Sequence, residues 1–272
     1  MEVYKHIRYR SFKKNTMRNY NKELDVLFEE WENESEKNGL TGFCRDGLLL
    51  KGKKFSKKSE EDGKTYWGRD SGNENEQWHN AKKRILFLMK DTNRNPGENM
   101  RTWIGRQNQK FITGMFFKNI ALWLTGLNSF NDKYNYLPFE EAIIPEVFTD
   151  TFDNLPISIV NIKKESGKGT VNNGVLWDYV DKSKKYGEFL KRQIKILNPN
   201  IVVCGGVIVL KIARKIIYPD VEFTEINNWI YFNSEKNIVL IESNHPSRSP
   251  YKDNYEGMME AFKEHLIKIN ER

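Results

Sequence analysis

The sequence has few cysteines and no long hydrophobic run. Cys44 and Cys204 are the only cysteines among 272 residues, too few for an iron–sulfur cluster held by four thiolates or for a cysteine-rich zinc site. No apolar run approaches the roughly 20 residues of a membrane-spanning helix, and the opening MEVYKHIRYR lacks the apolar core of a secretory signal. We therefore expect a soluble, cytoplasmic protein that does not contact the membrane, in a reducing compartment.

Several catalytic and nucleotide-binding motifs are also missing. SGKGT (166–170) looks like part of a phosphate-binding loop, but Ile162 stands where that motif requires a glycine. No GxGxxG follows a predicted strand, and the serine nucleophile motif GxSxG is absent. No histidine, cysteine or glutamate cluster has the spacing of metal ligands. We therefore expect no metal and no cofactor.

Positive charge exceeds negative charge. The chain has 44 Lys and Arg against 37 Asp and Glu, a formal net charge of +7. This balance favours a polyanionic partner, with nucleic acid as the first candidate and a membrane surface as the second. The alternative is a chain that is simply rich in lysine throughout. The segment KGKKFSKK (51–58) is either a basic patch or a solvated face, with a slight preference for the solvated face.

The first 80 residues differ from the rest of the chain. Residues 21–38 place Leu24, Leu27, Phe28 and Trp31 at helical spacing, which predicts an amphipathic helix that ends near Gly39. Residues 51–80 are polar and are expected to form loops. We therefore predict a helical and loop extension, residues 1–80, packed on a main domain of residues 81–272.

The main domain alternates short apolar runs with helical patterns. The runs at 85–89, 157–161, 201–204 and 238–242 are nearly continuous in Ile, Val and Leu, which is typical of strands covered on both faces. The segments between and after them repeat apolar residues at helical spacing. The predicted fold is α/β, a three-layer α/β/α sandwich with a central four-stranded parallel sheet. The run at 229–233 is either a hairpin partner of the last strand or an edge strand.

Polar residues or glycines follow each predicted strand. Ligands bind beyond the carboxyl ends of parallel strands, so these positions predict a site. Each also has a structural alternative: an aspartate can cap a helix, an asparagine can bond to buried backbone, and a histidine can be a core residue. The positions, in strand order, are Asp91 and Asn93, Asn161, Gly205 and Gly206, and His245.

The order and content of these strand ends resemble the uracil-DNA glycosylase superfamily over roughly residues 85–268. The segments that carry the resemblance are MKDTNR, VNIKK, LKRQIKILNPNIVVCGG and NHPSRSPY. It implies that Asp91 handles the water, that Asn161 reads a flipped base with Asn93 beside it, and that His245 stabilises the leaving base. Phe111 is the first candidate for stacking on that base, with Trp103 and Phe116 behind it.

The resemblance implies a monofunctional, cofactor-independent DNA glycosylase that acts as a monomer. Met89-Lys90 and Thr92 depart from the family's first motif and suit a divergent member. The expected substrate is therefore a uracil-like or modified pyrimidine, including glucosylated hydroxymethylcytosine of phage DNA, in repair or antiviral defence. The alternatives are a catalytically inactive DNA-binding module and a hydrolase of free nucleosides. The lysines in the expected DNA contacts can equally be solvated. Those contacts are Ser247, Arg248, Ser249, Tyr251, Lys163, Lys164, Lys168, Gly205 and Gly206.

Overall fold

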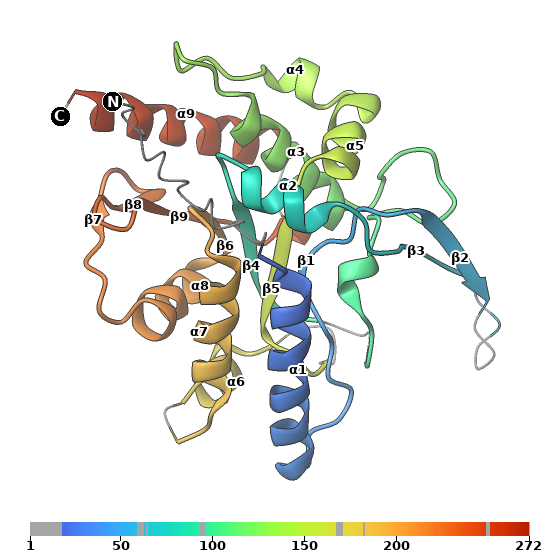
Figure 1. Ribbon diagram of the computed structural model, residues 1–272. Coiled ribbons are helices and arrows are strands. Elements are labelled where there is room, and N and C mark those ends of the chain that lie inside the picture. Colours follow the sequence, from blue (N-terminus) through green and yellow to red (C-terminus); the bar gives the residue numbers. More distant parts are fainter. Residues whose placement is uncertain are drawn as a thin grey trace, which may run out of the picture.

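The computed structural model describes residues 18–58, 63, 65–92, 96–166, 171–181, 183–248 and 251–271. Its centre is a seven-stranded sheet in the order β1-β5-β4-β6-β9-β8-β7 (Figure 1). The four strands in the middle of that order are mutually parallel. The strands are β1 (Gly47–Leu48), β4 (Ile85–Asp91), β5 (Ser158–Lys163), β6 (Ile201–Gly205), β7 (Thr224–Glu225), β8 (Ile230–Asn233) and β9 (Ile238–Ser243).

The prediction of an α/β fold around a mostly parallel sheet is confirmed, but the predicted four-stranded sheet is too small. β1 adds an antiparallel strand beside β5. At the other edge β8 pairs antiparallel with β9, and β7 pairs antiparallel with β8. The apolar run at 229–233 thus belongs to the hairpin partner of the last parallel strand. β1 and β7 have only two residues each, so neither is long enough to show a strand pattern.

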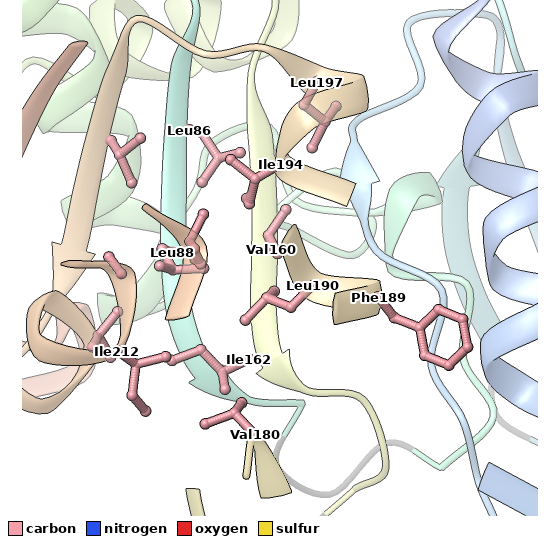
Figure 2. Close-up of a cluster of buried hydrophobic side chains, with 14 of the residues drawn as sticks. Leu86, Leu88, Val160, Ile162, Val180, Phe189, Leu190, Ile194, Leu197 and Ile212 are labelled. Atoms are coloured by element: carbon pink, nitrogen blue, oxygen red, sulfur yellow. The ribbon is translucent and has the colours of Figure 1, made fainter. Parts of the chain in front are cut away.

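Helices cover both faces of the sheet because the parallel strands are apolar on both sides. Leu86 and Leu88 of β4 belong to one buried cluster, whereas Phe87 and Met89 belong to the other. Figure 2 shows the first cluster, where side chains of β4 and β5 meet Leu190 and other residues of α7. The helices are α1 (Tyr20–Lys37), α2 (Glu74–Asn80), α3 (Met115–Ser129), α4 (Phe139–Ala142), α5 (Pro145–Asn154), α6 (Asn173–Tyr179), α7 (Tyr186–Leu197), α8 (Val207–Ile212), α9 (Tyr251–Asn270), the 3-10 turns η1 (Met100–Thr102) and η3 (Pro246–Arg248), and the π-helical turn η2 (Ala213–Ile217).

The described part of the first 80 residues is built into this core. The predicted amphipathic helix is α1, and its Trp31 stacks on Phe189 of α7 with ring centroids 5.5 Å apart. Trp78 of α2 is buried, and its indole N–H donates to the Leu197 carbonyl at 2.7 Å. The segment expected to be loop also contains a separate hairpin, β2 (Lys54–Lys58) and β3 (Thr65–Arg69).

Candidate site at the carboxyl edge of the sheet

The sheet reverses its winding direction beside β4. The chain passes from β4 to β5 on one side and then returns to β6 on the other side. In open α/β sheets, ligands bind at the carboxyl ends of two neighbouring strands whose onward connections leave in opposite directions. Here these strands are β4 and β6. Asp91 ends β4, Gly205 ends β6, and His245 follows β9 by two residues. The candidate site therefore has a carboxylate, a glycine turn and an imidazole at one edge.

His245 is fixed in one tautomer. The Ser247 backbone N–H donates to His245 Nδ1 at 3.3 Å, so in the neutral ring the hydrogen lies on Nε2. Burial lowers the pKa of His245, and the positive charges of Lys90 and Arg248 lower it further. The imidazole is therefore neutral near pH 7 and presents Nε2–H as a donor. Phe116 lies against it, with ring centroids 5.9 Å apart.

The loop after His245 is held by helix α3. The Arg248 N–H donates to the His245 carbonyl at 3.0 Å, which forms the 3-10 turn. The buried Asn119 of α3 donates from Nδ2 to the Pro246 carbonyl at 2.6 Å. Ser247 and Arg248 are exposed on this turn. The loop therefore presents two polar side chains from a turn that is anchored in the protein interior.

Asp91 lies beside Lys163 in the parallel ladder between β4 and β5. The Asp91 side chain is half-buried. Lys163 is engaged within the protein: its ammonium donates to the Glu165 carbonyl at 2.5 Å and lies 3.8 Å from the Glu165 carboxylate. Lys163, predicted to contact DNA, is thus bonded to Glu165, two residues further along the chain.

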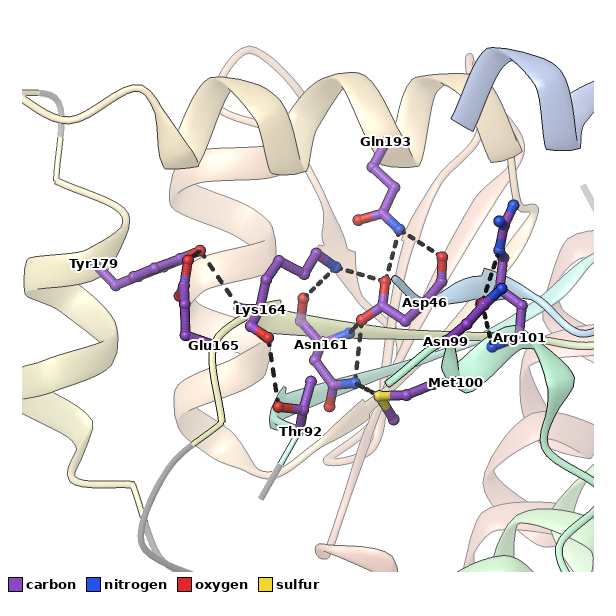
Figure 3. Close-up of polar contacts among 10 residues, drawn as sticks. All are labelled: Asp46, Thr92, Asn99, Met100, Arg101, Asn161, Lys164, Glu165, Tyr179 and Gln193. Carbon is purple, nitrogen blue, oxygen red and sulfur yellow. Dashed lines mark hydrogen bonds and ion pairs between the residues drawn. The ribbon is translucent and has the colours of Figure 1, made fainter. Parts of the chain in front are cut away.

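Asn161 belongs to a buried polar network centred on Asp46 (Figure 3). One Asp46 carboxylate oxygen accepts from the Asn161 backbone N–H at 2.7 Å and from its Nδ2 at 3.1 Å. The other oxygen accepts from Lys164 Nζ at 2.6 Å and from Gln193 Nε2 at 2.8 Å. Lys164 Nζ also donates to the Asn161 carbonyl at 2.8 Å. Asp46, which precedes β1, thus fixes the end of β5.

This network corrects the expected position of Lys164. We expected its ammonium on a DNA-binding surface, but the side chain is 0% exposed and paired with Asp46. An unpaired ammonium is very costly to bury, so its place in the interior depends on the Asp46 carboxylate. The sequence does not reveal this partner, because it lies 118 positions earlier in the chain.

The aromatic residues form a chain that ends at His245. The ring centroids of Phe116 and Phe117 lie 5.1 Å apart, and those of Phe117 and Trp103 lie 5.3 Å apart. Phe111, our first candidate for base stacking, instead has the ammonium of Lys110 over its ring at 4.7 Å. The ring packed against the candidate donor is therefore that of Phe116, which we had considered as an alternative.

Packing and backbone geometry within the protein account for both Gly205 and Gly206. A Cβ at Gly205 would lie 2.7 Å from Met89 Sδ, so a side chain there would collide with the neighbouring strand. Gly206 has a φ of +121°, which side chains disfavour. A Cβ there would lie 4.0 Å from Lys90 Cε. Lys90, which sequence analysis did not select as a site residue, therefore lies at the same edge as the glycine turn and His245.

The other predicted site residues divide into two groups. Tyr251 begins α9, and the ammonium of Lys118 lies 4.3 Å from its ring centroid. Asn93, Lys168 and Ser249 lie outside the described residues. Within the described ranges no three His, Cys, Asp or Glu residues are grouped so that they could hold a metal.

No family model matches the sequence, and no curated protein is significantly similar to it. No helix in the described part of the chain is long and apolar enough to cross a membrane.

Proposed function

We propose that the protein is a DNA glycosylase that flips a base and hydrolyses its N-glycosidic bond, leaving an abasic site. One observation carries the proposal: a strand-end carboxylate, Asp91, shares the carboxyl edge of the sheet with His245, a neutral imidazole that is fixed as an Nε2–H donor. Lys90 and Arg248 act electrostatically on that imidazole, which makes this edge favourable for an anion.

The reaction needs stabilisation of the two charges that develop as the bond breaks, and a carboxylate and a hydrogen-bond donor suit them. As the bond between the anomeric carbon and the base nitrogen breaks, its electron pair leaves with the base and the sugar becomes positive. The Asp91 carboxylate suits that positive charge and orients a water molecule, whose oxygen bonds to the anomeric carbon. One proton of this water passes to the Asp91 carboxylate and from there, through solvent, to the departed base anion, so that the base is released neutral and the carboxylate is regenerated. The His245 Nε2–H donates to an oxygen of the leaving base. Phe116 offers an aromatic face for the flipped base.

The substrate proposed is a modified pyrimidine or uracil in DNA. Lys90 and Thr92, which stand where the first motif of the uracil-DNA glycosylase superfamily has a glycine and a proline, support a modified base such as glucosylated hydroxymethylcytosine of phage DNA over uracil. Ser247, Arg248 and Tyr251 are the proposed contacts to the DNA backbone. The proposed form is a monomer.

The alternative is a catalytically inactive module that binds DNA and senses modified bases. It is favoured by Asn161, whose Nδ2 is already engaged with Asp46 Oδ2 at 3.1 Å and with Met100 Sδ at 3.6 Å. An amide whose N–H groups already donate within the protein has fewer donors available for the edge of a base.

The test is release of free base, measured by mass spectrometry, from duplexes carrying uracil, other deaminated bases or glucosylated hydroxymethylcytosine. We expect release from at least one duplex, and a loss of about 100-fold or more in Asp91→Asn and in His245→Gln. Lys236→Gln, an exposed position in the β8–β9 turn, is the control and should retain activity. Binding without release would favour the inactive module. Hydrolysis of free nucleosides alone would contradict both.

A further inference from the structure

The β2–β3 hairpin is an arm that projects from the side of the molecule (Figure 1). It forms a separate two-stranded sheet and shares no ladder with the central sheet among the described residues. An isolated two-stranded hairpin is only marginally stable in water. Its exposed side chains are therefore candidates for contact with another molecule.

The base of this arm is fixed to the protein. The Gly52 N–H donates to the Asp70 carbonyl at 2.8 Å, and the Asp70 N–H donates back to the Lys53 carbonyl at 3.0 Å. A Cβ at Gly52 would collide with the Ser71 carbonyl oxygen, so the two segments of the chain cross closely there. The Arg69 guanidinium pairs with the Asp153 carboxylate of α5 at 3.0 Å. The arm thus leaves the body in a defined direction.

The same aspartate connects the arm to the candidate site. Asp153 Oδ1 also accepts from Arg106 Nη1 at 3.0 Å. Arg106 lies three residues after Trp103 in the loop before α3. The ring of Phe152, the residue before Asp153, has its centroid 5.9 Å from that of Phe117. Phe117 in turn contacts Phe116, which packs against His245. The arm therefore originates within a few side chains of the proposed base pocket.

The strands of the arm combine lysines with exposed aromatic rings. Lys57 pairs across the strands with Tyr66, and Ser56 pairs with Trp67. Tyr66 is 49% exposed and Trp67 is 36% exposed, whereas Lys57 and Lys58 are both exposed. The segment 51–58 has five lysines and no acidic residue. Residues 60–62 are acidic in sequence and lie outside the described residues. Lys57, Lys58, Tyr66 and Trp67 all belong to the two strands.

We infer that the β2–β3 arm binds the duplex DNA that flanks the base held in the candidate site. Lys57 and Tyr66 share one face of the ribbon, and Lys58 and Trp67 share the other. The ribbon enters a groove between the two phosphate backbones, so that on each face the lysine contacts phosphates and the aromatic ring packs on sugars or bases. A two-stranded ribbon fits the width of the major groove, and ammonium groups beside aromatic faces suit a sequence-independent contact with nucleic acid. The inference rests on the proposed function in that DNA is the substrate.

The experiment measures the affinity for an unmodified, fluorescently labelled duplex by anisotropy at several salt concentrations. In Lys57→Gln/Lys58→Gln we expect roughly tenfold weaker binding at low salt, and a salt slope smaller by about 1.8, because two phosphate contacts are lost. Trp67→Ala should weaken binding with the slope unchanged. The control, Lys133→Gln/Lys236→Gln, removes the same charge from exposed positions elsewhere and should leave both quantities nearly unchanged.

The outcomes separate this inference from the proposed function. An unchanged affinity and slope in Lys57→Gln/Lys58→Gln, while the wild type still releases base, would overturn the arm alone. A reduced slope in a protein that releases no base would support the arm and count against the glycosylase. If the lysine variant changes only the oligomeric state by ultracentrifugation, the arm is a self-association surface and the inference is overturned. Circular dichroism checks that each variant is folded.

Discussion

At the scale of single residues, the Asp46–Lys164 ion pair has the greatest structural consequence. Both side chains are 0% exposed, and their charged atoms are 2.6 Å apart. The carboxylate also receives bonds from Asn161 and Gln193, so every donor around it depends on its charge and position. Removal of one partner of such a pair leaves an uncompensated charge in the interior.

We predict that Lys164→Met lowers the free energy of unfolding by about 3–5 kcal/mol. The double variant Asp46→Asn/Lys164→Met should be less destabilised, because no charge is then left unpaired. Urea unfolding monitored by circular dichroism provides the measurement. Lys184→Met is the control, since Lys184 and Asp178 form an exposed pair that should contribute less than about 1 kcal/mol. A loss in Lys164→Met as small as in that control would contradict the prediction.

The sequence could predict only part of the candidate site at this scale. Asp91 and His245 were predictable because each lies within three residues of the end of an apolar run, and parallel strands bring such ends to one edge. Asp46 was not, because it follows no long strand and its partners lie 115 or more positions away. Lys90 was missed since a lysine beside an aspartate carries no specific signal.

At the scale of elements, the crossing of α3 and α9 depends on a glycine. A Cβ at Gly126 of α3 would lie 2.5 Å from Met259 Sδ and 2.8 Å from the Tyr255 ring, both on α9. Glycine in a helix interior costs roughly 0.5–1 kcal/mol relative to alanine. Its presence here is therefore explained by the close approach of the two helices.

We predict that Gly126→Ala destabilises the protein by about 1–3 kcal/mol, because the new methyl group forces α3 and α9 apart. In a Met259→Ala background the cost of Gly126→Ala should fall, since the nearest atom is then absent. Gly174→Ala in α6 is the matched control: its Cβ meets nothing closer than 3.5 Å, so it should be neutral or stabilising by up to about 1 kcal/mol. Thermal unfolding of the four variants checks this; equal costs for Gly126→Ala in both backgrounds would refute the explanation.

Elements were predictable from the sequence where they are long and apolar. The four parallel strands and α1 have continuous or periodic hydrophobic residues that match their burial. The β2–β3 arm has none, because lysines occupy most of β2 and its strands are largely exposed. α2 has seven residues and depends on the burial of Trp78, a tertiary contact that local sequence does not encode.

At the scale of the whole molecule, one buried histidine predicts a loss of stability in acid. His265 of α9 is 2% exposed and packs against Phe232 at 4.6 Å. Burial lowers the pKa of His265 to about 4, below its ordinary value of 6.5. As pH falls below about 6.5, the unfolded chain takes up this proton before the folded chain does, so stability is lost between about 6.5 and about 4.

We predict that this residue contributes about 3 kcal/mol to that loss. In His265→Leu the free energy of unfolding should therefore fall less steeply with pH over this interval than in the wild type. Urea unfolding at several pH values, at constant ionic strength, measures the two slopes. Parallel slopes in the two proteins would show that His265 titrates normally in the folded state.

The pairing of the N-terminal elements with the middle of the chain also sets an order for biosynthesis. α1 packs on α7, β1 pairs with β5, and the Trp78 indole bonds to the Leu197 carbonyl. None of these partners exists when the first 80 residues leave the ribosome, because domains are synthesised from the N-terminus. The Leu197 carbonyl lies 119 positions after Trp78, and Phe189 lies still further from Trp31. The apolar surfaces of both tryptophans therefore stay uncovered until α7 has been synthesised, and exposed surface of this kind makes the nascent chain a substrate for chaperones.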